Sequence, residues 1–190
     1  MSFFVNIGLG SVSISLKEIF LTIIGHQENY IIQHYRLPKA FTAVLAGSGL
    51  GISGLLMQTL FRNPLAGPFV LGISSGASLG VAIVILGSSL MGGFLATVFI
   101  SKWSIVIAAS LGSFIVLLAV MIVAAKIRDT MAILIIGLMF GSITAALVSV
   151  LSYFSSAELI QQYVFWGFGN LGNLTWYEVV IFFSIYGRQT

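Results

Sequence analysis

Histidine and carboxylate side chains do most acid–base and metal chemistry in proteins, and this sequence holds few of them. His26 and His34 are eight residues apart, whereas two ligands on one face of a metal-binding helix are usually four apart. Helix capping explains Asp129, which comes just before an apolar run. Glu158 and Glu178 have no neighbouring acid with which to form a carboxylate pair. The sequence therefore predicts no catalytic residue, no metal site and no cofactor.

Two glycine-containing patterns resemble catalytic or nucleotide-binding motifs only by their letters. Residues 72–76 (G-I-S-S-G) match a nucleophile elbow, but no strand precedes them. The glycine-rich segments lack the lysine of a P-loop, so we do not expect the chain to bind ATP by that route. The chain has no cysteine, which excludes disulfide bonds and thiolate chemistry. The pattern of residues does not predict an enzyme.

The composition indicates the medium in which the chain folds. Hydrophobic residues make up 58% of the 190 residues and charged residues 7%, against about 25% charged in an ordinary soluble domain. So few charges cannot cover a soluble domain of this length, and lipid must therefore solvate much of it. The net charge of +3 is spread along the chain and gives no basic patch for nucleic acid. The sequence predicts an integral membrane protein in a lipid bilayer.

Long charge-free runs predict the elements that cross the membrane, since a spanning helix needs roughly 20 apolar residues. The runs are residues 40–61, 103–125 and 130–157. A further span is expected over about 69–90, after a turn that includes Pro64. The runs are continuous rather than alternating, which favours helices over strands. The expected fold is all-α, a polytopic transmembrane helix bundle with about four complete spans and partial ones.

Small residues recur every four positions in three of these spans, as Ala43, Gly47 and Gly51, then Gly72, Gly76 and Gly80, then Gly137, Gly141 and Ala145. Such spacing lets helix backbones approach closely, so we interpret most of these glycines as packing positions. The spans hold serine, threonine and one amide but no charged residue, which argues against a proton relay. This pattern is typical of a passage with weakly polar walls, whose energy and specificity come from partners.

The remaining segments are more polar. Residues 11–39 are interpreted as an extramembrane connection with one short helix, and Pro38 fits the first turn of the next helix. Residues 155–177 mix aromatic residues with glycine and asparagine, which predicts an amphipathic helix at the membrane surface and then a turn. Residues 178–190 are interpreted as the start of another span.

One long motif resembles a known family. R-L-P-K at residues 36–39, followed by G-I-S-G-L-L-M-Q-T-L-F-R-N-P-L-A-G-P-F-V-L-G-I-S-S-G-A-S-L-G at 51–80, is similar to the permease subunits of ABC importers. The similarity is to the FecCD/BtuC-like permeases, which carry iron–siderophores, heme and vitamin B12. Residues 10–15 resemble the first external loop of that family, and residues 163–176 resemble its segment between the fifth and sixth spans.

The resemblance implies part of a ten-helix permease of a type II ABC importer. Residues 1–190 would be a single truncated transmembrane domain, with an external loop at 11–39, helices 2 to 5 at 40–154, an interfacial helix and loop at 155–177, and the start of helix 6 at 178–190. Such permeases are homodimers in the bacterial cytoplasmic (inner) membrane, with cytoplasmic ATPase subunits and an external or periplasmic substrate-binding protein. The family's coupling loop follows helix 6, so the expectation is that this chain alone does not support ATP-driven transport.

The resemblance also implies roles for individual residues. Arg36 and Lys39 match two basic residues that meet acidic residues of the binding protein, Arg36 as a bidentate donor and Lys39 as a point charge. Positions of the cytoplasmic gate match Asn63, Leu65, Thr130 and Met131. Met131 is apolar where the vitamin B12 permease has a small polar residue. The fifth helix would line the pathway with Gly137, Gly141 and Ser142.

Two other functions stay open at this point. An ion-coupled secondary transporter would show intramembrane charge or interrupted helices in inverted repeats, and neither is evident. A non-transporting membrane scaffold fits the small-residue faces but leaves the R-N-P-L turn at 62–65 unexplained. For the importer permease, the expected mechanism is alternating access, in which ATP-driven motion of the dimer opens one gate at a time.

Overall fold

The computed structural model describes residues 7, 14–26, 28–91, 101–127, 129–172 and 175–187, and all regular elements in these ranges are helices. The predicted all-α membrane helix bundle is therefore confirmed. The chain forms two compact units. One contains Met1–Ile52 and Asn170–Thr190, and the other contains Ser53–Gly169.

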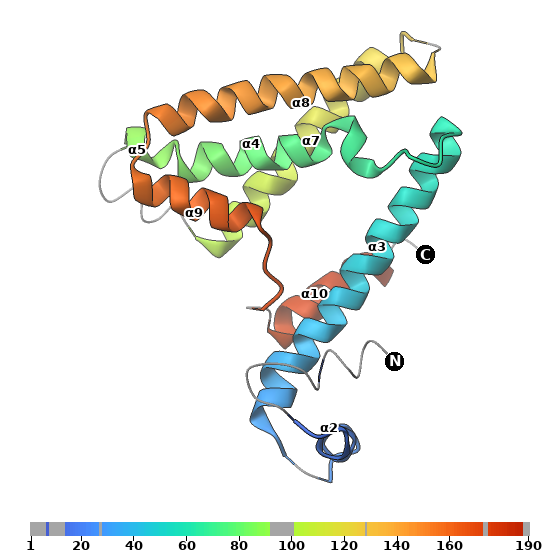
Figure 1. Ribbon diagram of the computed structural model, residues 1–190, viewed down its shortest axis with the longest axis vertical. Coiled ribbons are helices and arrows are strands. Elements are labelled where there is room, and N and C mark those ends of the chain that lie inside the picture. Colours follow the sequence, from blue (N-terminus) through green and yellow to red (C-terminus); the bar gives the residue numbers. More distant parts are fainter. Residues whose placement is uncertain are drawn as a thin grey trace. The chain divides into compact units, whose positions relative to one another are not determined.

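The first unit holds α2 (Leu16–Ile23), the π-helical turn η1 (Ile32–Arg36), the start of α3 (Leu37–Phe61), and α10 (Trp176–Gly187). α2 begins at a reciprocal cap, in which the Ser15 hydroxyl accepts from the Glu18 N–H and the Glu18 carboxylate accepts from the Ser15 N–H. The Trp176 indole N–H donates to the Gln33 carbonyl oxygen at 2.7 Å, and its ring lies near Phe41. These contacts hold the start of α10 beside the first turns of α3 (Figure 1).

The π-helical turn continues directly into α3, so the helix starts earlier than predicted. The charge-free run begins at Ala40, whereas α3 begins at Leu37, with Pro38 in its first turn as predicted, and the helical segment is continuous from Ile32. The Leu37 N–H donates to the carbonyl of Ile32, five residues back. Pro38 has no N–H and its ring crowds the carbonyl four residues before it, and a wider turn gives that ring room. Residues 11–39 thus contain the predicted short helix, α2, and a helical turn that the prediction missed.

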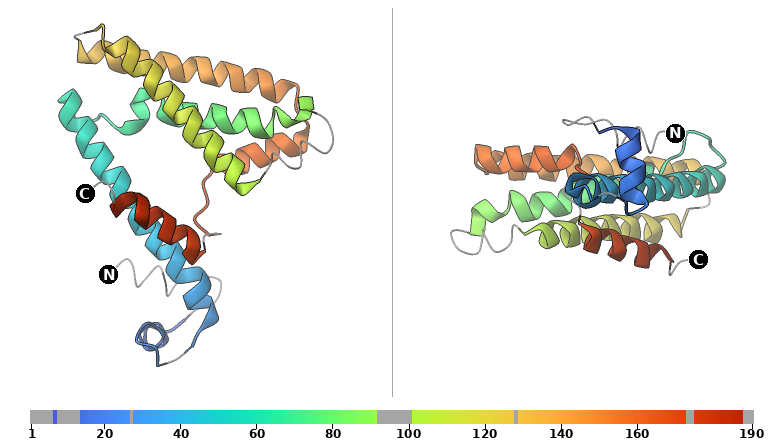
Figure 2. Two further views of the ribbon diagram at one scale, coloured as in Figure 1. Left: turned by 180° about the vertical axis from the view of Figure 1, so that it is seen from behind. Right: turned by 90° about the horizontal axis from the view of Figure 1, so that it is seen from below.

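The second unit is built around α4. Its elements are the 3₁₀ helix η2 (Pro68–Leu71), α4 (Ile73–Ile85), α5 (Ser88–Met91), α7 (Lys102–Ala124), α8 (Thr130–Tyr153) and α9 (Ala157–Gly167). α4 packs against both α7 and α8, which lie on different sides of it (Figure 2). α9 covers the C-terminal half of α4, where Tyr163 and Trp166 pack on Val81 and Ile85 (Figure 1).

Small residues allow the close contact between α4 and α7. An added Cβ at Gly76 would lie 2.5 Å from the Gly112 carbonyl oxygen and 2.8 Å from Val116 Cγ2. At Gly80 it would collide with the carbonyl of Ala108. The interpretation of these α4 glycines as packing positions is confirmed. The glycines of α3 differ, because an added Cβ at Gly47 or at Gly51 meets nothing within 4 Å.

The expected continuous span over 69–90 is wrong. Gly72 has a φ of +75°, a left-handed conformation that separates η2 from α4 and that strains other residues. α4 has 13 residues, a length of about 20 Å at 1.5 Å per residue. Within the described part of the chain, three helical segments are long and apolar enough to cross a membrane, namely Ile32–Phe61, Lys102–Ala124 and Met131–Tyr153. Among the described residues, three helical segments are thus long enough for a complete span, against the predicted four or so, and α4 is shorter than a spanning helix.

Candidate functional site

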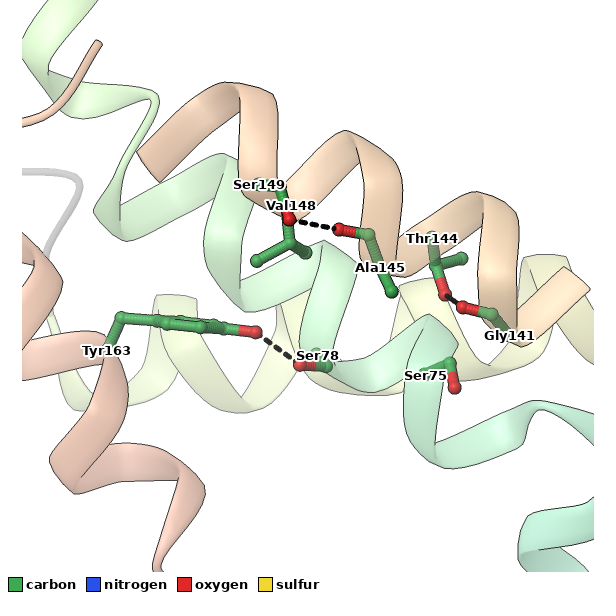
Figure 3. Close-up of a pocket in the computed structure, with 8 residues that line it drawn as sticks. All are labelled: Ser75, Ser78, Gly141, Thr144, Ala145, Val148, Ser149 and Tyr163. Carbon is green, nitrogen blue, oxygen red and sulfur yellow. Dashed lines mark hydrogen bonds between the residues drawn. The ribbon is translucent and has the colours of Figure 1, made fainter. Parts of the chain in front are cut away.

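A pocket of about 310 Å³ lies between α4, α8 and α9 in the second unit. Figure 3 shows Tyr163 of α9 reaching the pocket from one side, with α4 and α8 forming the others. The lining residues are Ser75, Ser78, Gly141, Thr144, Ala145, Val148, Ser149 and Tyr163. Five of these eight side chains carry a hydroxyl group, and none carries a charge.

The hydroxyl groups in the pocket differ in how they are bonded. Thr144 donates to the Gly141 carbonyl oxygen at 2.8 Å, and Ser149 donates to that of Ala145 at 3.0 Å, so both use their protons within α8. Ser78 and Tyr163 share a hydrogen bond that joins α4 to α9 (Figure 3). The oxygens of these two α8 hydroxyls can therefore accept hydrogen bonds from a molecule in the pocket while their own bonds within α8 are kept.

Ser75 differs from its neighbours at the other end of the pocket. Its side chain faces Gly141, where an added Cβ would lie 3.3 Å from Ser75 Oγ. Among the described residues no hydrogen bond is seen for this hydroxyl, whereas Thr144 and Ser149 both bond to their own helix. A hydroxyl in this state can donate to a molecule in the pocket.

The predicted gate residues Asn63 and Leu65 lie in the turn between α3 and η2. The Asn63 side chain accepts from the Leu65 N–H at 2.9 Å, and Arg62 before it has a positive φ of 47°. The Leu65 side chain is 86% exposed, which is unusual for a leucine held in a fixed turn. The structure thus presents Leu65 outward on a turn that Asn63 stabilises.

The other two gate residues are the first residues of α8. Asp129 caps this helix as predicted, accepting from the Met131 N–H at 3.0 Å. The Met131 side chain is exposed, and the side chain of Thr130 lies outside the described part of the structure. The turn and the start of α8 share one apolar cluster, because Phe61 and Ala66 beside the turn belong with Ile133 of α8.

The two predicted docking residues occupy adjacent turns of one helix but have different surroundings. Arg36 ends the π-helical turn, is half-buried, and donates from Nη1 to the Ile7 carbonyl oxygen. Lys39, in the first turn of α3, is exposed. The structure therefore gives Arg36 a contact within its own unit, while the charge of Lys39 is at the surface.

Two of the three predicted pathway residues, Gly137 and Gly141, lie four residues apart on one face of α8, and Ser142 lies on another face. Gly137 is buried against η2, where an added Cβ would lie 2.3 Å from the Val70 carbonyl oxygen and 2.8 Å from Leu71 Cα. Gly141 borders the pocket. Ser142 is exposed, and its hydroxyl donates to the Leu138 carbonyl oxygen at 3.2 Å.

Comparison with known proteins decides the family. Residues 1–187 match the FecCD transport family. The chain belongs to this family. It is 32% identical over 178 residues to the hemin transport permease HmuU of Yersinia pestis and 32% identical over 155 residues to the vitamin B12 import permease BtuC of Klebsiella pneumoniae. It is 30% identical over 191 residues to the molybdate import permease MolB of Haemophilus influenzae.

The alignments with these FecCD relatives cover 93%, 81% and 94% of the chain, but 52%, 44% and 53% of the relatives. The chain thus spans about half the length of the curated relatives it matches. An inward-facing transporter assigned to the metal-chelate type of ABC transporter is similar in structure, with a TM-score of 0.77 and 28% identity. That match covers 96% of this chain and 54% of the other. Membership of the FecCD family confirms the prediction of a multi-pass membrane permease rather than an enzyme.

The sequence prediction for this FecCD chain missed the pocket. It placed Tyr163 among interfacial aromatic residues and described the serines of the spans, Ser75 and Ser78 among them, only as part of a weakly polar passage. A usable signal was present on α8, where Gly141, Thr144 and Val148 follow the spacing of one helix face. Nothing in the sequence indicates that α9 brings a tyrosine hydroxyl onto α4.

Proposed function

We propose that this chain is part of the membrane-spanning permease subunit of an ABC importer. The importer would move an iron–siderophore, heme or cobalamin-type chelate across a bacterial cytoplasmic membrane. The observation that carries the proposal is the family match over residues 1–187, with named import permeases at 30–32% identity. The molybdate permease among these relatives adds a small oxyanion to the cargoes that need testing. The weakly polar and uncharged spans agree with a cargo that is passed on rather than held tightly.

The proposed assembly is a homodimer of the permease with cytoplasmic ATPase subunits and an external substrate-binding protein. Arg36 and Lys39 would meet acidic groups of the binding protein. Asn63, Leu65, Thr130 and Met131 would form the inner gate, and Gly137, Gly141 and Ser142 would belong to the helix along the pathway. The exposed Leu65, on a turn fixed by Asn63, supports a role as a gate side chain.

Disruption of the gene in its own cells tests this function. Uptake of a labelled ferric siderophore, hemin, cobalamin and molybdate is measured in the disrupted and parent strains. We expect uptake of one of these cargoes to fall to background while the others are unchanged, and a plasmid copy of the gene to restore it. Unchanged uptake of all four would refute the proposed function.

A further inference from the structure

The pocket between α4, α8 and α9 has the size of a site for a small molecule or for one arm of a larger one. Its volume is about 310 Å³, at the lower end of the roughly 300–1,000 Å³ typical of ligand pockets. Its walls combine hydroxyl groups with apolar atoms, such as those of Ala145 and Val148.

The lining selects for the chemistry of the occupant. A charged group would lose part of its hydration and find no opposite charge, because none of the described residues that line the pocket is charged. An apolar group would cover the Ser75 hydroxyl and the oxygens of Thr144 and Ser149 without giving them hydrogen bonds. Groups that are uncharged and can both donate and accept hydrogen bonds avoid both costs.

The shared hydrogen bond of Ser78 and Tyr163 defines one end of this site. It joins α4 to α9, and Tyr163 is supported from behind by its stack on Trp166, with ring centroids 6.3 Å apart. Ser75 and Gly141 lie toward the other end (Figure 3). The pocket therefore has a hydroxyl pair at one end and, at the other, the Ser75 hydroxyl, for which the described residues show no hydrogen bond.

We infer that this pocket is a binding site for uncharged hydrogen-bonding groups of the hydroxyl and amide class, carried by the imported chelate. Ser75 acts as the donor, and the hydroxyl oxygens of Thr144 and Ser149 act as acceptors. That the groups belong to a transported cargo rests on the proposed function; the selectivity of the pocket for uncharged groups does not. The proposed pathway residues all belong to α8. This inference means that α4 and α9 would contact the cargo as well.

Thiol labelling tests this inference, and the chain has no cysteine of its own that would react with the label. Ser75→Cys is expressed in membranes and treated with three methanethiosulfonates of similar size, carrying a neutral hydroxyethyl, a cationic trimethylammonium-ethyl or an anionic sulfonatoethyl group. Each rate is divided by the rate at Gln161→Cys, an exposed position on α9. Ser113→Cys is the dry control, because that half-buried side chain donates to the Ile73 carbonyl oxygen at the contact between α4 and α7.

We expect the neutral reagent to modify Ser75→Cys on the order of tenfold faster than either charged reagent, since burying an unpaired charge is costly. Thr144→Cys should show the same selectivity, which keeps the test valid if one variant folds poorly. Ser113→Cys should react with none of the three. Equal normalised rates for all three reagents, or no reaction at either pocket position in folded protein, would overturn the inference.

Transport measurements separate this inference from the proposed function. Ser75→Ala, in the gene that restores uptake, should lower the apparent affinity for the cargo while Ser152→Ala, whose hydroxyl bonds within α8, should not. If selective labelling is found but gene disruption leaves uptake unchanged, the proposed function fails and the pocket chemistry stands. If uptake is lost on disruption but the labelling shows no selectivity, the pocket inference alone fails.

Discussion

Gly76 shows how a single hydrogen atom at Cα decides whether two helices can touch. The Cβ of any other residue there would lie 2.5 Å from the Gly112 carbonyl oxygen of α7, well inside van der Waals contact. Lipid gives no hydrophobic drive for helix association, so this close packing supplies much of the attraction between α4 and α7. The same residue type in α3 has no such neighbour, since Gly47 meets nothing within 4 Å.

Gly76→Ala should therefore destabilise the second unit. Overpacking of a tight contact typically costs about 1–3 kcal/mol in free energy of unfolding. Thermal unfolding in detergent, followed by circular dichroism, measures the change. Gly47→Ala is the matched control and should be neutral or slightly stabilising, because alanine is the better helix former. Equal effects of the two substitutions would contradict the packing role of Gly76.

The hydrogen bond between Ser78 and Tyr163 should show as a coupling energy. In a double-mutant cycle of Ser78→Ala and Tyr163→Phe, we expect coupling of about 0.6 kcal/mol and at most about 1.7, the range found for hydrogen bonds between membrane helices. Unfolding free energies of the wild type, both single variants and the double variant give the value.

Ser152→Ala combined with Tyr163→Phe serves as the control for that cycle. The Ser152 hydroxyl donates to the Val148 carbonyl oxygen of its own helix at 2.8 Å. Those two substitutions should add within about 0.5 kcal/mol, as independent sites do. Coupling of the same size in both cycles would show that the Ser78 bond is not specific.

At the scale of helices, the apolar runs predicted where most helices lie. They did not predict that one expected helix is broken. The run at 103–125 became α7 over Lys102–Ala124, and the run at 130–157 became α8 over Thr130–Tyr153, because length and hydropathy are enough to define a spanning helix. The run at 69–90 was broken instead, since the left-handed Gly72 has a conformation that hydropathy does not report. The pocket could not be predicted, because it depends on how α9 folds back onto α4.

The start of α9 makes a prediction about pH. A hydrogen bond from its own backbone N–H lowers the pKa of Glu158 below the ordinary value of 4.5, with a smaller contribution from the Ser156 hydroxyl. The folded pKa is thus below the unfolded one, so the ionised carboxylate stabilises α9 at pH values above 4.5. This stabilisation is lost as the pH falls through the folded pKa.

Trp166 in α9 can report that transition after Trp103→Phe and Trp176→Phe, which leave it as the single tryptophan. We expect its fluorescence to change as the pH falls, with a midpoint below 4.5. Glu158→Gln in the same background removes the titrating group and should abolish the change. A midpoint above 4.5 would mean that the backbone hydrogen bond does not stabilise the ionised carboxylate of Glu158.

At the scale of the whole molecule, the two basic residues of the R-L-P-K motif should contribute to docking unequally. Lys39 is exposed, whereas Arg36 donates to the Ile7 carbonyl oxygen. Lys39→Glu should weaken binding of the substrate-binding protein on the order of tenfold at low salt, by like-charge repulsion, and the difference should shrink at 1 M salt. Surface plasmon resonance on the reconstituted permease measures both.

Arg36→Ala is the companion variant in that experiment. It should lower the thermal stability of the permease as well as its affinity, because it removes a hydrogen bond within the first unit. Lys39→Glu should leave stability unchanged. If instead Lys39→Glu binds like the wild type at low salt, the proposed docking role of this residue is wrong.

The π-helical turn before Pro38 has a consequence for alignments of this family. Its bond from Leu37 back to Ile32 encloses one residue more than an ordinary α-helical turn does. A relative with one residue fewer between Tyr30 and Leu37 could form a regular turn there and leave α3 unchanged in length and apolar face. We expect single-residue gaps in such alignments to gather at this turn, and residues N-terminal to it to be rotated by about 100° around the helix axis in the gapped relatives.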